Sequence, residues 1–92
     1  MDAKKEIERS ITRCDGEIAA ATQAVRNKVA ALHRYAAEAE ESLARGCGAS
    51  TFACTATNVS RLAIELAQAA AELDQATRFK DQFQTALDFI NG

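Results

Sequence analysis

The 92-residue chain is short enough for a single domain, and its formal charge of -2 leaves no excess of Lys and Arg for binding phosphate groups, so direct nucleic-acid binding is not expected. It contains no run of eighteen apolar residues, which argues against a membrane-spanning segment, and its charged N-terminal stretch lacks the apolar core of a secretory signal. These features predict a cytoplasmic protein, in which cysteines are expected as free thiols.

Alanine dominates the apolar residues. It occurs 21 times, whereas Ile, Leu and Val together number 14 and Phe four. Alanine has the highest helix propensity but buries little area. The absence of proline permits long helices. This composition predicts an all-α chain with a thin core, completed by dimerisation or by another protein.

The strongest pattern runs from Ile7 to Leu43, where apolar residues recur every three or four positions, as on one face of a helix. The residues of this stripe are Ile7, Ile11, Cys14, Ile18, Ala21, Val25, Val29, Leu32, Ala36, Ala39 and Leu43. They predict a helix over about residues 2–45, with Asp2 as a possible N-cap and Gly46 just beyond its end. Such a helix spans about 65 Å, and so narrow a seam needs a second helix along it.

The dipeptide Asp15-Gly16 is a turn signal that could divide this helix and give three helices in all. Cys14 and Ile18 nevertheless keep the helical phase across the glycine. We therefore expect one continuous helix, with the break as the alternative.

A loop is expected over residues 46–55, which contain two glycines and three hydroxyl residues. Ser50, Thr51 and Thr55 are the candidate N-caps of a second helix over about 56–91, beginning between 51 and 56. Its seam follows heptad spacing, with Lys80 as the polar exception: Val59, Leu62, Leu66, Ala69, Leu73, Ala76, Lys80, Phe83, Leu87 and Ile90. Two long helices joined by a short loop predict an antiparallel helical hairpin.

Candidate partner-binding residues are those that the predicted seam leaves outside. The far side of the second helix carries Ile64, Ala67 and Ala71, and Phe89 also points away from the seam. The other candidates are the acidic group and the loop tip between Cys47 and Cys54: Glu38, Glu40, Glu41 and Phe52. Scattered exposed apolar residues and a solvated acidic face are the simpler interpretations.

Chemistry is not expected at any site. Cys14 falls on the seam as a small apolar residue, Cys47 and Cys54 match no metal-binding spacing, and His33 stands alone. No catalytic residues, metal ligands or cofactor site can be assembled from the sequence. An enzyme is therefore not expected.

Three functions fit such a chain. The first is a non-enzymatic protein–protein interaction module that docks a helix face on a partner, which is another protein, a second copy in a homodimer, or both. The second is a small inhibitor from a phage or mobile element, of the anti-CRISPR or anti-defence type, that blocks a host protein complex. The third is a secretion or tail-assembly chaperone. No motif in the sequence selects one of them.

Overall fold

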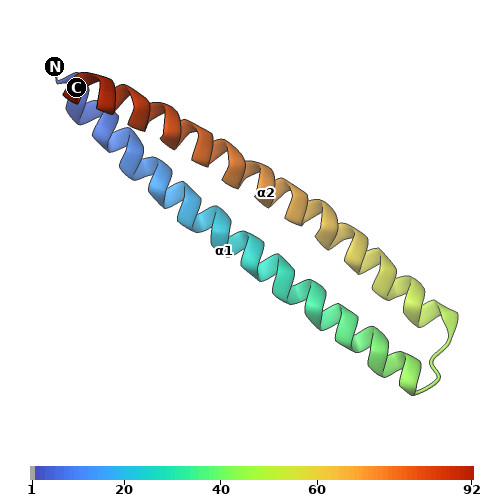
Figure 1. Cartoon of the computed structure of the whole chain (residues 1–92). Coiled ribbons are helices and arrows are strands. Elements are labelled where there is room, and N and C mark those ends of the chain that lie inside the picture. The colour runs from blue at the N-terminus through green and yellow to red at the C-terminus, as the bar shows by residue number, and fades with distance from the viewer. Residues whose placement is uncertain (1) are drawn as a thin grey trace.

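The computed structural model describes residues 2–92 as two helices, α1 (Ala3–Ala44) and α2 (Ala49–Asn91), that lie side by side in opposite directions (Figure 1). Both ends of the described residues 2–92 lie at one end of the rod and the connecting turn at the other. The rod measures 67 × 19 × 15 Å, which agrees with the expected helix length. The predicted all-α helical hairpin is confirmed.

α1 is continuous through the Asp15-Gly16 dipeptide. At its start the Asp2 carboxylate accepts a hydrogen bond from the Lys4 backbone N–H at 3.0 Å, so Asp2 is the N-cap. Gly16 is exposed, whereas Cys14 is buried and Ile18 half-buried against α2. Packing on both sides of the glycine therefore outweighs the cost of about 1 kcal/mol that a mid-helix glycine carries.

The turn between the helices is fixed by backbone hydrogen bonds at the end of α1. Gly46 has φ +72°, a left-handed conformation that favours glycine. Its N–H donates to the Leu43 carbonyl at 3.1 Å, and the Cys47 N–H donates to the Ser42 carbonyl at 3.0 Å. This pair of bonds is a Schellman motif, and it confirms the expected role of Gly46.

The prediction of a loop over 46–55 is wrong, because α2 begins at Ala49 with Gly48 as its N-cap. None of the three predicted caps serves. The Thr55 hydroxyl donates instead to the Thr51 carbonyl at 3.2 Å, inside the first turns of the helix. The turn at Gly46 has already reversed the chain, so Ala49 and its neighbours can join the helix at once.

Contacts between α1 and α2 follow a heptad spacing on both helices. The buried and half-buried seam positions of α1 are Ile7, Ile11, Cys14, Ile18, Ala21, Val25, Lys28, Leu32, Tyr35, Ala39 and Ser42. Those of α2 are Phe52, Thr55, Val59, Leu62, Leu66, Ala69, Leu73, Ala76, Lys80, Phe83 and Leu87. The predicted seam of α2 is confirmed from Val59 to Leu87. Ile90, predicted as its last member, is 47% exposed, so this part of the prediction is wrong.

Beyond Val25 the predicted seam of α1 is confirmed at Leu32 and Ala39 but wrong at three positions. The seam runs through three residues that each stand one position earlier than expected: Lys28, Tyr35 and Ser42. The three predicted residues are exposed instead: Val29, Ala36 and Leu43. Two helices that pack along their whole length must share one period, and α2 is strictly heptad.

Neither α1 nor α2 contains a stretch long and apolar enough to cross a membrane, as far as the described residues 2–92 go.

Candidate protein-binding surface

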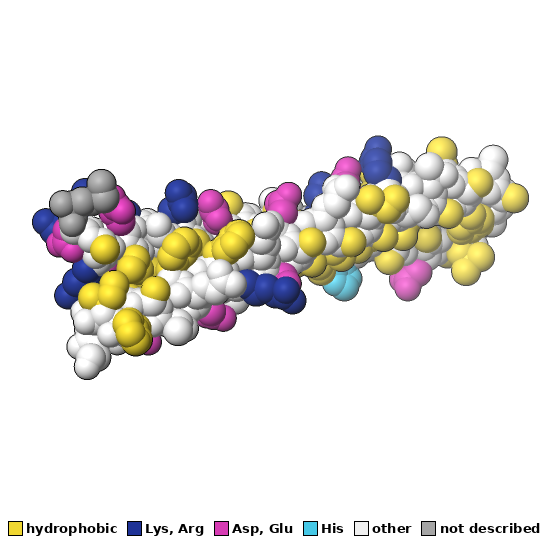
Figure 2. All heavy atoms as spheres, turned by 90° about the horizontal axis from the view of Figure 1, so that it is seen from above, with side chains coloured by type: hydrophobic (Ala, Val, Ile, Leu, Met, Phe, Trp, Pro, Cys, Tyr) yellow, Lys and Arg dark blue, Asp and Glu magenta, His cyan; other side chains and the backbone are white. Residues whose placement is uncertain are grey.

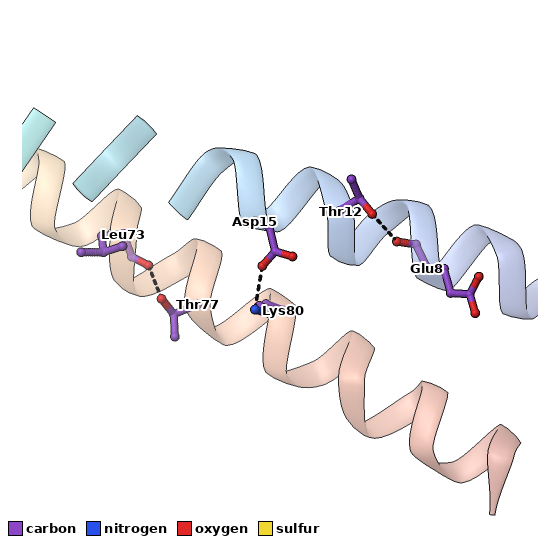
Figure 3. Close-up of polar contacts among 6 residues, drawn as sticks. All are labelled: Glu8, Thr12, Asp15, Leu73, Thr77 and Lys80. Carbon is purple, nitrogen blue, oxygen red and sulfur yellow. Dashed lines mark hydrogen bonds and ion pairs between the residues drawn. The ribbon is translucent and has the colours of Figure 1, made fainter. Parts of the chain in front are cut away.

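Two ion pairs join the helices. Lys28 Nζ lies 2.7 Å from Glu65 Oε2, in the half of the rod nearer the turn. Lys80 Nζ reaches across from α2 to Asp15 Oδ1 at 2.6 Å, in the half nearer the chain ends (Figure 3). We call residues 25–44 and 49–70 the loop half, and residues 2–24 and 71–92 the terminal half.

These contacts shift the pKa values of Glu65 and Lys80. The hydrogen bond from Lys28 lowers the pKa of Glu65 below its ordinary value. The hydrogen bond to Asp15 raises the pKa of Lys80 above its ordinary value. Both shifts favour the charged partners, although the side chains remain about one-third to one-half exposed, so each pair contributes little to stability.

The ion pairs mark the two long faces of the hairpin. Asp15 directly follows the seam residue Cys14 on one flank of α1, and Glu65 directly precedes Leu66 on the opposite flank of α2. Positions at seven-residue intervals share a flank. The residues that share the Asp15 face in the loop half are Val29, Ala36 and Leu43 of α1, and Ala56, Ala63 and Ala70 of α2.

We call these six residues the loop-half apolar face. All six are exposed, Val29 to 37% and Leu43 to 71%. No charged side chain stands among them, although Arg26, His33 and Glu40 line the outer edge of α1. Figure 2 shows hydrophobic side chains merging into a broad area over the loop half, next to the cyan histidine. Bulky and small apolar side chains exposed together over two helices make this area suited to packing against protein.

The same face has the opposite character in the terminal half. It carries Glu8, Asp15, Thr22, Thr77, Gln84 and Asn91, the seam residue Lys80 reaches it, and Lys5, Asp74, Asp81 and Asp88 line its outer edges. Among these carboxylates only Asp15 and Asp74 have ion-pair partners in the described part of the chain, Asp74 with Arg78 at 3.1 Å. The face therefore changes from acidic to apolar near the middle of the rod.

The Glu65 face holds a groove of about 430 Å³ at mid-rod. Its floor is alanine, and its lining is Glu17, Ala20, Ala21, Ala24, Glu72, Gln75, Ala76 and Phe79. Small side chains on both helices leave this space open. Carboxylates from both helices border it, so it is a less apolar surface than the loop-half apolar face.

The predicted partner-binding residues do not form one patch. Ile64 is 61% exposed and Phe89 84% exposed, but Ile64 stands in the loop half of α2 and Phe89 near its C-terminal end. Ala67 and Ala71 are exposed beside Ile64, whereas Phe52 is half-buried in the seam. Their role in binding stays a prediction.

The acidic residues near the end of α1 are also divided. Glu38, Glu40 and Glu41 are exposed but point to different sides of the helix. Glu41 Oε1 lies 4.0 Å from Arg45 Nη2. Only Glu40 borders the loop-half apolar face.

The thiols and the histidine form no cluster. Cys14 is buried, Cys47 half-buried and Cys54 exposed, and all three are free thiols. Within residues 2–92, no three His, Cys, Asp or Glu side chains lie close enough together to hold a metal ion.

Sequence reasoning missed the loop-half apolar face because it assigned Val29, Ala36 and Leu43 to the seam. The signal that could have found them is the period of α2. A strict heptad on one helix requires the same on the other, which places Lys28, Tyr35 and Ser42 inside.

Comparison with protein-family models, with curated proteins and with solved structures finds no match to this chain. Its function therefore has to be inferred from its own geometry and charges.

Proposed function

We propose that the chain is a non-enzymatic protein–protein interaction module that self-associates through the loop-half apolar face. The observation that carries the proposal is that this face, with Leu43 71% exposed, has no covering element within the hairpin. Packed interfaces between subunits are apolar at their centre and polar at their rim, and this face has both features.

The exposed area supports the same proposal. The hairpin exposes 6547 Å², whereas a compact protein of its mass exposes about 5,200 Å². Its radius of gyration is 20.3 Å, against about 12 Å for a compact chain of this length. The excess of about 1,300 Å² exceeds the roughly 800 Å² that each partner buries in an interface of standard size. A second copy could cover that excess.

Sedimentation at micromolar concentration tests the proposal with a matched pair of variants. Ala36 lies on the loop-half apolar face, and Ala37, also exposed, points about 100° away on the same helix. The unmodified chain is expected to sediment as a dimer. Ala36→Arg is expected to sediment as a monomer with unchanged helicity by circular dichroism, whereas Ala37→Arg remains dimeric.

If the unmodified chain stays a folded monomer at these concentrations, the proposal is overturned. Equal behaviour of the two variants would reject the assigned face. Ala71→Arg provides the comparison with the far side of α2: if it alone dissociates the dimer, the contact uses Ile64 and its neighbours instead, and the loop-half apolar face is excluded.

A further inference from the structure

We infer that two copies pack antiparallel with an overlap centred on their loop halves, α1 against α1 and α2 against α2, so that the two terminal halves project for most of their length in opposite directions. This arrangement rests on the proposed self-association and specifies its geometry. It contrasts with a side-by-side dimer in which both turns lie at the same end and the rods overlap along their whole length.

The change of character along the face limits the overlap. The apolar part ends with Val29 on α1 and Ala70 on α2. A side-by-side dimer would press the acidic terminal half of one copy against the same acidic surface of the other. Like charges brought together in this way oppose association. The antiparallel arrangement covers the apolar part of each copy and leaves most of both acidic parts in water.

Charges at the edge of the face are complementary in the antiparallel arrangement. Arg26, His33 and Glu40 stand at seven-residue intervals along the outer edge of α1. Neither Arg26 nor Glu40 forms an ion pair with another residue of the described chain. A two-fold axis that passes beside His33 places Arg26 of each copy opposite Glu40 of the other.

The side-by-side dimer offers no such match. Its two-fold axis runs along the rod, which sets α1 of one copy against α2 of the other. Arg26 then faces the α2 edge around Ala67, and Glu40 faces the edge around Ala53. The Arg26–Glu40 pairing is thus specific to the antiparallel dimer.

The two arrangements differ in length, which small-angle X-ray scattering of the dimer measures. The single rod is 67 Å long. With the axis beside His33, a rise of about 1.5 Å per residue gives an overlap of about 42 Å and a dimer about 90 Å long. The side-by-side dimer would be about as long as one rod. A maximum dimension near 90 Å is the expected result, and one near 70 Å in a confirmed dimer would overturn the arrangement without affecting self-association.

Charge reversal tests the pairing directly. Arg26→Glu or Glu40→Arg alone creates two repulsive contacts per dimer and is expected to weaken dimerisation by about tenfold in low salt. The double variant Arg26→Glu/Glu40→Arg exchanges the charges and is expected to recover the original dissociation constant to within about threefold. Both positions are exposed, so circular dichroism should show unchanged helicity in all three variants.

The outcomes separate the two proposals. Recovery in the double variant supports the antiparallel pairing. Additive weakening in the double variant overturns it while leaving a dimer in place. A chain that is monomeric in sedimentation, before any charge is reversed, overturns both the pairing and the proposed function.

Discussion

In the terminal half of the hairpin, the face that carries Asp15 is polar and charged, and the large apolar side chains that are exposed there, Phe79, Phe89 and Ile90, lie off that face. Ile7, Ile11, Ile18, Phe83 and Leu87 all occupy seam positions there. The loop half distributes the same kinds of residues differently. Its seam includes Lys28 and Ser42, and Val29 and Leu43 are exposed on the face that carries Asp15. The same long face of one continuous pair of helices is thus polar in the terminal half and apolar in the loop half.

This difference shows that regular helix pairing does not by itself place apolar residues inside. The heptad period of α2 sets which residues of α1 face it, and in the loop half that period selects Lys28 and Ser42. Val29 and Leu43 each follow one of these seam residues by one position and therefore lie outside the seam. The hairpin consequently exposes apolar residues that the predicted α1 stripe would have buried.

The largest expected effect compares a leucine inside the loop half with one outside it. Leu62 is 6% exposed and Leu43 is 71% exposed. Leu62→Ala should lower the free energy of unfolding by about 2–4 kcal/mol, because it leaves a cavity in the seam. Leu43→Ala should change it by less than about 0.5 kcal/mol in the monomer. Denaturant unfolding at a concentration below the dimer dissociation constant measures both, and equal losses would mean that Leu43 is a core residue.

Smaller effects on stability are expected from replacing two glycines, Gly46 in the turn beside the loop half and Gly16 in the terminal half. Gly46→Ala should cost about 1 kcal/mol, since its φ of +72° strains any other residue. Gly16→Ala, in the terminal half, should instead stabilise the chain by up to about 1 kcal/mol, because Gly16 is exposed and a Cβ there meets nothing within 4 Å.

Gly48→Ala serves as the control for the turn. Its φ of -79° is ordinary and a Cβ there also meets open space. Thermal melting should leave this variant close to the unmodified chain. A loss equal to that of Gly46→Ala would indicate that the turn depends on flexibility rather than on the left-handed conformation.

The smallest expected effects distinguish the two ion pairs by pH. Because the folded pKa of Glu65 is lowered, the Lys28–Glu65 contact stabilises the loop half above the ordinary glutamate pKa, and that contribution is lost as the pH falls through the folded pKa. Because the folded pKa of Lys80 is raised, the Asp15–Lys80 contact is fully present below the ordinary lysine pKa and is lost as the pH rises through the folded pKa.

Unfolding titrations of Glu65→Gln and Lys80→Met measure these contributions. Glu65→Gln should flatten part of the acid dependence and leave the alkaline limb unchanged. Lys80→Met should flatten part of the alkaline dependence of stability and leave the acid limb unchanged. A change on the wrong limb in either variant would contradict the assignment.

Most of the fold could be predicted from the sequence, because its signals are local. The apolar spacing defines both helices, Asp2 caps the first, and Gly46 ends it. The start of α2 could not be predicted, since Ser50, Thr51 and Thr55 resemble caps, while the hydroxyl of Thr55 is used inside the helix.

The candidate site was harder to predict because it depends on a relation between the helices. The exposure of Ile64 and Phe89 agrees with the helical arithmetic of α2 alone. The loop-half apolar face requires the period of α2 to be imposed on α1. In the sequence of α1 alone, the stripe through Val29, Ala36 and Leu43 is as regular as a seam, so nothing in α1 itself indicates that these residues are exposed.

The position of the chain ends has a practical consequence. Both ends of the described chain lie at the tip of the rod farthest from the turn (Figure 1). A fluorophore or immobilisation tag attached to either end would be held most of the 67 Å rod length away from Leu43 and the turn. Such attachments offer a way to observe or anchor single molecules while the surface near the turn stays open to solution.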